Sequence, residues 1–187
     1  MTERKLASEI QLLQTLSQAI SEALDFHTAL STALLQVCEF TGWDYGEAWV
    51  PSKEGTVLEL SPVWYISSRR GSDSVLALEL FRLCSEAFIL SPASGLPGRV
   101  WSSQQPEWIS DVSAESETYF LRNQIAKAVG LRAGFGVPIL ANNQVLAVLV
   151  FFMLEACEED RQLVELVTAV ATQVGAVLQR SSAVIRG

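Results

Sequence analysis

The chain has 187 residues, of which 49% are hydrophobic, and its mean hydropathy of +0.26 allows a substantial buried core. This composition argues against intrinsic disorder, which goes with low hydrophobicity. The formal charge of −8 and a pI near 4.7 argue against a nucleic-acid groove or an anionic membrane surface as the partner.

The N-terminus and the cysteines indicate the compartment. The first residues are polar and their apolar members recur at helical spacing, so we expect no secretory signal. Cys38, Cys84 and Cys157 are far apart in the sequence and form no CxxC pair. We therefore expect no metal, iron–sulfur or disulfide framework, and we expect a reducing cytoplasm as the setting.

Residues 2–24 have the pattern of a long amphipathic helix with two apolar stripes. One stripe contains Leu6, Ile10, Leu13, Ile20 and Leu24, and the other contains Leu12, Leu16, Ala19 and Ala23. A helix with two stripes packs against two surfaces, which predicts contacts with the rest of the domain and with a partner helix. Asp25 is placed to cap a second helix over residues 26–40.

The next segments alternate between strand and helix patterns. Residues 43–50 and 56–66 are predicted strands joined by a turn, the second with a bulge at Pro62. After a polar loop at 67–74, residues 75–88 show helical spacing. That spacing is carried by Leu76, Leu80, Leu83 and Ala87.

A glycine- and proline-rich turn at residues 94–98 opens a short helix in the predicted scheme. A short strand follows at 107–112. Residues 113–129 are a predicted helix with Gly130 as its stop.

Two apolar runs, 131–140 and 145–153, form a predicted hairpin around Asn142 and Asn143, since asparagine tolerates a positive φ angle. Nearly every position in both runs is apolar, which predicts strands covered on both faces. The acidic residues 158–160 then precede a helix with heptad-like steps. Those steps are Leu163, Val167, Val170, Val174 and Val177. The order of elements predicts an α+β fold with an antiparallel sheet between two helical layers.

Five sequence blocks in this order resemble the GAF domain family over essentially the whole chain. They are residues 42–49 (GWDYGEAW), 95–101 (GLPGRVW), 108–112 (WISDV), 130–139 (GLRAGFGVPI) and 148–152 (VLVFF). The resemblance is to GAF domains of bacterial, especially cyanobacterial-type, sensor histidine kinases and related signalling proteins. It implies a six-stranded antiparallel sheet with a ligand pocket on one face and dimerising terminal helices on the other. Residues 1–187 would then form one GAF domain, with a dimerisation helix at 1–24, a core at 25–157 and a signalling helix at 158–182.

The family hosts several chemistries, so the site residues have to discriminate between them. The Cys-His pair of the phytochrome-like branch would fall near Leu121 and Arg122, so covalent bilin is not expected. The Asn-Lys…Phe-Asp-Glu motif of cyclic-nucleotide GAF domains does not occur, and Val100 and Leu121 stand where methionine-sulfoxide reductases carry cysteines. His27 lies away from the implied pocket, so haem is not expected either. The domain is not expected to be an enzyme.

What remains is a non-covalent pocket for a small molecule. The candidate ligand-binding residues are Trp64, Tyr65, Trp101, Trp108, Asp111, Tyr119, Phe120, Arg122, Arg132 and Phe135. An arginine among aromatic side chains would suit a carboxylate. Core packing is the competing interpretation for the aromatic residues, as are turn anchoring for Arg99 and loop capping for Asp111.

Two functions are therefore open. One is a regulatory module that senses a small molecule and transmits the change through the terminal helices of a homodimer. The other is a ligand-free dimerisation or protein-interaction domain. Neither interpretation involves nucleic acid or membrane insertion.

Overall fold

A computed structural model describes the backbone of residues 2–23 and 25–185. Leu24, a member of the first predicted stripe, lies outside these ranges. The helices are α1 (Thr2–Ser21), α2 (Phe26–Thr41), α3 (Ser72–Ser85), α4 (Gly95–Ser103), α5 (Asn123–Val129) and α6 (Arg161–Ile185). The strands are β1 (Tyr45–Pro51), β2 (Leu58–Ile66), β3 (Ile89–Leu90), β4 (Glu107–Ile109), β5 (Ala133–Ala141) and β6 (Gln144–Met153).

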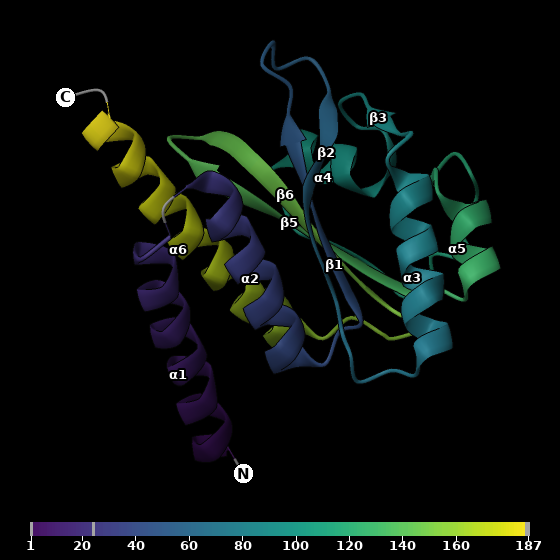
Figure 1. Cartoon of the computed structure of the whole chain (residues 1–187), viewed down its shortest axis with the longest axis horizontal. Coiled ribbons are helices and arrows are strands. Elements are labelled where there is room, and N and C mark those ends of the chain that lie inside the picture. Colours follow the sequence, from purple (N-terminus) through teal and green to yellow (C-terminus); the bar gives the residue numbers. More distant parts are fainter. Residues whose placement is uncertain (1, 24, 186–187) are drawn as a thin grey trace.

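The six strands form one antiparallel sheet in the order β3-β2-β1-β6-β5-β4. Helices α1, α2 and α6 cover one face, and α3 and α5 lie on the other (Figure 1). Two separate hydrophobic cores result, one on each side of the sheet. The predicted α+β sandwich with an antiparallel sheet is confirmed.

The hairpin of β5 and β6 lies in the interior of the sheet, between β1 and the edge strand β4. Asn142 and Asn143 have φ angles of 51° and 60°, as a two-residue turn requires, and Ala141 pairs with Gln144 across it. Seven consecutive residues of β5 are buried. The strand β6 contributes Leu149 and Phe151 to the core on one face of the sheet and Val148 and Phe152 to the core on the other. The predicted hairpin, and its cover on both faces, are confirmed.

The strand β2 carries the predicted irregularity. Glu47 of β1 pairs with Trp64 and Trp49 pairs with Leu60, so the segment around Pro62 contains two more residues than the strand opposite it. Proline cannot donate to a sheet ladder, which is why it is tolerated at a bulge. The short strand β3, which pairs with β2 at the sheet edge, was not predicted because two residues give no periodic pattern.

The prediction of one helix over residues 113–129 is wrong, because only Asn123–Val129 is helical. Side-chain bonds to the backbone hold the preceding segment as turns. Asp111 accepts from the Ser113 amide at 3.0 Å, and the Asn123 side chain donates to the carbonyl oxygens of Val112, Ser113 and Glu115. Such local bonds compete with helix formation.

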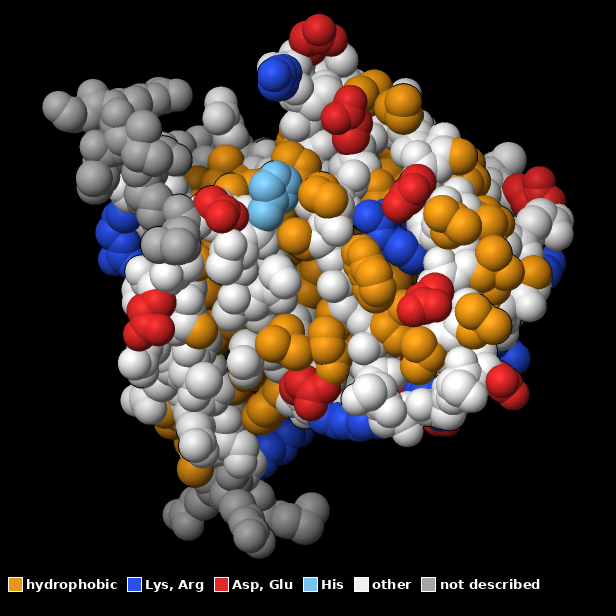
Figure 2. Space-filling model, in the orientation of Figure 1, with side chains coloured by type: hydrophobic (Ala, Val, Ile, Leu, Met, Phe, Trp, Pro, Cys, Tyr) orange, Lys and Arg blue, Asp and Glu red, His pale blue; other side chains and the backbone are white. Residues whose placement is uncertain are grey.

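Helix α3 begins and ends three residues earlier than predicted, and its leucine spacing does not mark its buried face. Leu76, Leu80 and Leu83 are 51–66% exposed. The residues that enter the second core are instead Leu78, Phe81, Arg82 and Ser85. Figure 2 shows the many hydrophobic side chains exposed on this side of the molecule.

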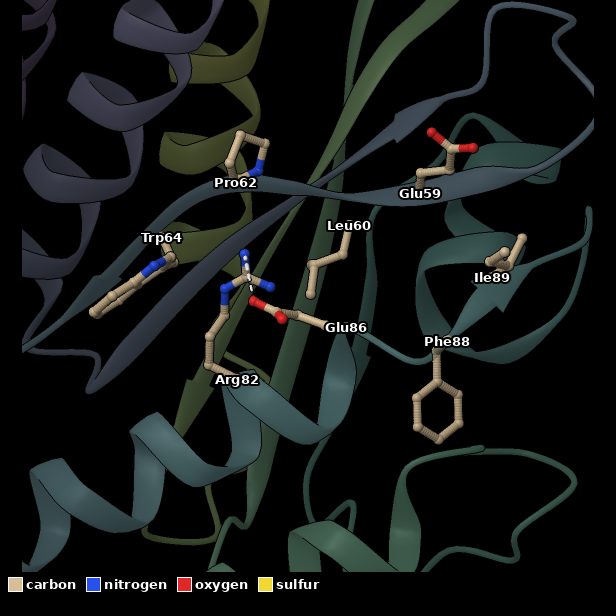
Figure 3. Close-up of a pocket in the computed structure, with 8 residues that line it drawn as sticks. All are labelled: Glu59, Leu60, Pro62, Trp64, Arg82, Glu86, Phe88 and Ile89. Atoms are coloured by element: carbon tan, nitrogen blue, oxygen red, sulfur yellow. Dashed lines mark ion pairs between the residues drawn. The ribbon is translucent and has the colours of Figure 1, made fainter.

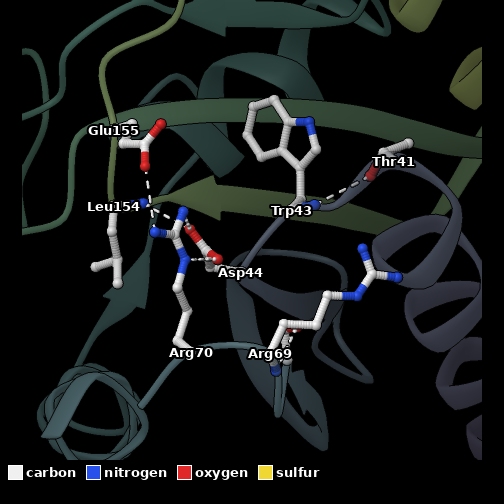
Figure 4. A network of polar contacts seen from close by, with 8 residues as sticks. Thr41, Trp43, Asp44, Arg69, Arg70, Leu154 and Glu155 are labelled. Carbon is white, nitrogen blue, oxygen red and sulfur yellow. Dashed lines mark hydrogen bonds and ion pairs between the residues drawn. The ribbon is translucent and has the colours of Figure 1, made fainter.

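A polar clamp fixes the ends of β1, β2 and β6 to one another (Figure 4). Asp44 is 2% exposed, and its carboxylate accepts from Arg70 at 2.7 and 3.2 Å. The same carboxylate accepts from the Leu154 amide at 2.9 Å. Arg70 also donates to Glu155 at 3.2 Å. Because the buried Asp44 carboxylate accepts three hydrogen bonds that tie together the ends of three strands, this clamp is structural.

The predicted cap of α2 is confirmed, and a residue of the acidic segment 158–160 caps α6. Asp25 accepts from the Thr28 amide at 2.8 Å, and Asp160 accepts from the amides of Gln162 and Leu163 at 3.0 and 3.1 Å. Residues 161–180 of α6 are long and apolar enough, by composition alone, to cross a membrane. However, Val167, Val170 and Val174 of that segment are at most 1% exposed because they pack in the first core, which accounts for the apolar composition.

Candidate functional site

The second core, between the sheet and α3 to α5, contains a buried ion pair. Glu47 on β1 is fully buried, and Arg122, directly before α5, is 3% exposed. The guanidinium donates Nη2 to Oε1 at 2.5 Å and Nη1 to Oε2 at 3.0 Å. This two-pronged geometry is the strong form of an arginine–carboxylate contact.

Neighbouring side chains form further hydrogen bonds with the Glu47 carboxylate and the Arg122 guanidinium. The Tyr45 hydroxyl donates to Glu47 at 2.9 Å and the Trp49 indole donates to it at 2.8 Å. Arg122 also donates to the Ser85 hydroxyl at 2.9 Å. Burial, reinforced by the negative charge of Glu47, holds the pKa of Tyr45 well above its usual value. The carboxylate thus accepts four hydrogen bonds, which leaves it no lone pair for a ligand or a proton transfer.

Aromatic rings enclose the Arg122 guanidinium. Its central carbon lies 4.7 Å from the ring centre of Phe81, 5.2 Å from Trp49, 5.3 Å from Phe152 and 5.7 Å from Phe120. Cation–π attraction in a desolvated site is worth about 2 kcal/mol or more for a strong contact. The interior of this face is therefore filled by the protein's own side chains, and it joins β1, β6, α3 and α5 into one unit.

A hollow of about 460 Å³ opens beside this interior, between β2 and the end of α3 (Figure 3). It is lined by Glu59, Leu60, Pro62, Trp64, Arg82, Glu86, Phe88 and Ile89. Its volume falls within the range of small-molecule sites, which is about 300–1,000 Å³.

Among the described residues that line the hollow, Arg82 is the one cation, and it is 7% exposed. Its Nη2 atom donates to the Ser61 carbonyl at 2.9 Å and lies 3.8 Å from a carboxylate oxygen of Glu86. Its Nε and Nη1 atoms are buried and find no hydrogen-bond acceptor among the residues that the structure describes. A buried donor without an acceptor costs about 1–3 kcal/mol, so this guanidinium has unused capacity to bind.

Of the sequence-predicted ligand residues, only Trp64 lines the hollow, where its side chain is 42% exposed. Phe120 and Arg122 lie in the filled interior next to it, and Trp101 packs at the margin of the same core. These residues share a face of the sheet.

Three other candidates lie on the opposite face. Trp108 and Phe135 pack with Trp43 in the first core, with ring centres 5.2–6.3 Å apart. The Trp108 indole donates to the Cys157 carbonyl at 2.8 Å. Tyr65 donates to Glu39 of α2, and its burial raises its pKa to about 12. The structure therefore places these aromatics with the helices α2 and α6, away from the hollow.

The remaining candidates form surface ion-pair contacts. Arg132 donates to Asp111 at 2.5 and 2.9 Å. Tyr119 stacks under Arg99, which is paired with Glu107 at 2.6 Å and also donates to the Tyr119 carbonyl. Arg99 and Asp111 thus anchor loops, as the competing interpretation held.

Sequence reasoning missed Glu47, Ser85 and Arg82. A signal for Glu47 was present, since it is the only charged residue among residues 45–50 of an otherwise apolar strand. A charge at such a position needs a buried partner. The sequence around Arg82 carried no comparable signal. The leucine spacing of α3 predicted that the leucines face the core and Arg82 faces solvent, whereas the structure shows the reverse.

The described residues give little support to metal or thiol chemistry. No group of three histidine, cysteine or acidic side chains that could hold a metal ion occurs within the described ranges. Cys38 is buried in the first core, and burial raises the pKa of its thiol. His27 lies at the start of α2 with its ring 5.8 Å from Phe26.

Comparison with known structures shows the fold. The GAF domain of a phosphoenolpyruvate-protein phosphotransferase from Acinetobacter superposes with a TM-score of 0.70 at 15% identity, over 96% of this chain and 98% of that one. A free methionine-R-sulfoxide reductase from Neisseria meningitidis, solved with its substrate, gives 0.72 at 14% identity over 96% and 93%. Residues 122 to 287 of a methyl-accepting chemotaxis protein give 0.67 at 13% identity over 90% and 98%.

A sequence relative is more limited in extent. The transcription factor bHLH13 of Arabidopsis thaliana is 35% identical over 68 residues, which is 36% of this chain and 12% of that protein. This chain thus matches only a small part of that relative. The family model described as "GAF domain" matches residues 23–179, which include every strand of the sheet and most of α6. The chain therefore belongs to the GAF domain family.

Proposed function

We propose that this GAF domain is a regulatory, sensory module of signal transduction. It binds a small molecule non-covalently and transmits the change through the terminal helices of a homodimer. The observation that supports this best is that α3, whose end lines the hollow, and the terminal helices α1 and α6 lie on opposite faces of one sheet. Figure 1 shows this arrangement of the helices. A ligand on one face can then bias the packing of helices on the other.

The dimer part of the proposal is supported by an incomplete helical surface. Leu12 and Leu16 of α1 are buried within the domain, whereas Leu6 and Ile10 are 57% and 47% exposed. These two leave a groove of about 370 Å³ between α1 and α6. Its lining also includes Lys5, Glu9, Leu13, Gln162, Glu165, Leu166 and Ala169. A second copy of the same helix pair would cover this apolar strip, as in a helical bundle.

The test of the dimer is the mass in solution. Light scattering after size exclusion should give twice the 20.5 kDa chain mass, and replacing Leu6 and Ile10 by Ser should shift it toward monomer. Leu83→Ser is the matched control, since Leu83 is 64% exposed on α3, on the other face. A concentration-independent monomer of the unaltered protein would contradict the dimer.

The signalling context rests on two supports. The sequence blocks resemble GAF domains of bacterial, especially cyanobacterial-type, sensor histidine kinases, and this resemblance supports the proposed role in two-component signalling. One of the similar structures belongs to a methyl-accepting chemotaxis protein. The proposed setting is the cytoplasm, without nucleic acid or membrane insertion, in line with the charge of −8.

The domain itself is proposed to be non-catalytic, although one similar structure is a methionine-R-sulfoxide reductase. The hollow is lined by carboxylates, one arginine and apolar side chains, with no thiol or imidazole among the described residues. Incubation with free methionine sulfoxide and a dithiol reductant should give no methionine. Turnover would contradict this part of the proposal.

A ligand-free interaction module is the second candidate function. It is favoured by the filled interior around Glu47 and by the exposed leucines of α3, which form an apolar surface on the ligand face. The two functions differ in one measurement. A sensor changes its thermal midpoint when its small molecule is added, whereas an interaction module does not respond to any small molecule.

A further inference from the structure

The hollow beside α3 has an anion-binding group at its base. Arg82 is held against β2 by the Ser61 carbonyl, and its Nε and Nη1 atoms have no acceptor among the described residues. An acceptor that reaches this guanidinium would relieve an unfavourable desolvation of about 1–3 kcal/mol per donor. Carboxylate and phosphate groups both form strong, charge-assisted hydrogen bonds with arginine. Because Glu59 and Glu86 also line the hollow, a singly charged carboxylate meets less repulsion there than a phosphate.

The rim of the hollow has the opposite charge. Glu59 and Glu86 both line it, and the Glu86 side chain is 56% exposed. Counting Arg82, the lining has a net charge of −1 from one cation and two anions. A simple anion would meet two carboxylates on entry, and a simple cation would meet Arg82.

Apolar side chains form the rest of the wall. Trp64 is 42% exposed and Ile89 is 66% exposed, and both line the hollow together with Leu60, Pro62 and Phe88, all of them drawn in Figure 3. Large side chains left exposed at the lining of a cavity are available to cover the apolar part of a ligand. The cavity thus offers three chemical surfaces in one small volume: a guanidinium, a pair of carboxylates and an aromatic wall.

We propose that this hollow binds a small zwitterion of the amino-acid class, with its carboxylate on Arg82, its ammonium group between Glu59 and Glu86, and its apolar side chain against Trp64. The proposal rests on the proposed sensory function and assigns the chemical class of the molecule sensed. The filled interior around Glu47 and Arg122 takes no part in contacting this molecule. It forms the rigid floor beside Arg82.

The test uses three probes with the same phenyl group. L-Phenylalanine carries both charges, 3-phenylpropanoate lacks the ammonium group, and 2-phenylethylamine lacks the carboxylate. The readout is the shift of the Trp64 indole N–H signal in a ¹⁵N-labelled protein, assigned by the variant Trp64→Phe. The other common L-amino acids are titrated in the same way, to find the side chain that fits best.

The expected result is saturable binding of at least one amino acid with the Trp64 signal shifted, and binding of each single-charge analogue weaker by about tenfold or more. Arg82→Met and Glu86→Gln should each weaken the amino acid by about tenfold. Glu86→Gln changes a half-exposed side chain, so it keeps the test valid if Arg82→Met fails to fold. Arg69→Met is the matched control, because Arg69 pairs with Glu39 on the other side of the sheet and should leave binding unchanged.

Two outcomes would overturn the inference. Equal affinity for 3-phenylpropanoate and L-phenylalanine would show that the carboxylates of the rim play no part. No shift of the Trp64 signal with any amino acid up to about 10 mM would show that the hollow does not bind this class. If no amino acid binds but the dimeric protein co-purifies with a molecule of another class, the amino-acid proposal fails and the sensory function stands. If the protein responds to no small molecule at all, both the amino-acid proposal and the sensory function are refuted.

Discussion

Replacing Glu47 by Gln removes one charge from the buried ion pair and keeps the shape of the side chain. The Trp49 indole, which donates to Oε1, can still bond to the amide oxygen, but an NH2 group takes the place of Oε2, the acceptor of the Tyr45 hydroxyl. Arg122 also loses its counter-charge inside the protein. Removing one partner of a buried pair costs about 3–5 kcal/mol, because the remaining charge is desolvated without compensation. That is a large share of the roughly 5–15 kcal/mol by which domains are stable.

The assay is urea unfolding at fixed protein concentration, followed by tryptophan fluorescence. With a slope of about 2 kcal/mol per molar urea, the midpoint of Glu47→Gln should fall by about 1.5–2.5 M. The double variant Glu47→Leu with Arg122→Met removes the unpaired charge and should recover part of the loss. The recovery is incomplete because the buried Tyr45 and Trp49 donors are left without their acceptor. A Glu47→Gln midpoint within about 0.5 M of the parent protein would refute the reasoning, since it would mean that Arg122 is neutralised by solvent.

Three further predictions concern packing and ionisation. Gly175→Ala should destabilise the fold by about 1–3 kcal/mol, because the added Cβ would lie 2.2 Å from the Leu140 carbonyl oxygen. This clash outweighs the better helix propensity of alanine. The control Gly71→Ala has open space around its Cβ and should be nearly neutral in the same unfolding measurement. Burial and the bond to Glu39 raise the pKa of Tyr65 to about 12, so its contribution to stability is full below pH 10 and is lost as the pH rises toward 12. The alkaline fall of the urea midpoint should therefore be smaller in Tyr65→Phe, and an identical fall would count against that bond. Iodoacetamide should leave Cys38 unmodified in the native protein and label it after unfolding, because Cys38 is buried and the pKa of its thiol is raised. If peptide mass mapping finds the label on Cys38 in the native protein, the core around Cys38 opens and the prediction is wrong.

The sequence predicts most of the fold because its patterns were strong where burial is complete. The hairpin of β5 and β6 is apolar on both faces, so its strands and the Asn142–Asn143 turn follow from composition and φ preference. The helix over 113–129 was wrong because Asn123 uses its side chain to hold the backbone of residues 112–115, and periodicity does not reveal such bonds.

The candidate site was harder to predict than the fold. Arg122 and Phe120 do lie on the face of the sheet that carries the hollow. The sequence did not show that Glu47 pairs with Arg122 and so leaves this arginine no free group for a ligand. Tyr65, Trp108 and Phe135 were placed with them, yet they lie on the other face. In a strand the side-chain face changes with every residue, and the bulge at Pro62 makes such an assignment on β2 unreliable.

The buried face of helix α3 also could not be predicted from the sequence. Its leucines recur at helical spacing, yet they are exposed, and the buried side of the helix presents Arg82 and Ser85 to the sheet. Hydrophobic periodicity identifies an inner face only when the opposite face is polar. Here both faces are apolar, so the orientation of α3, and with it the position of Arg82 in the hollow, required the structure.

Native mass spectrometry of the purified domain tests the sensory function most directly. The account predicts a dimer of the 20.5 kDa chain that gains one small mass per chain when amino acids are present, with the added mass lost in Arg82→Met. A monomer that retains no small molecule under these conditions would contradict it.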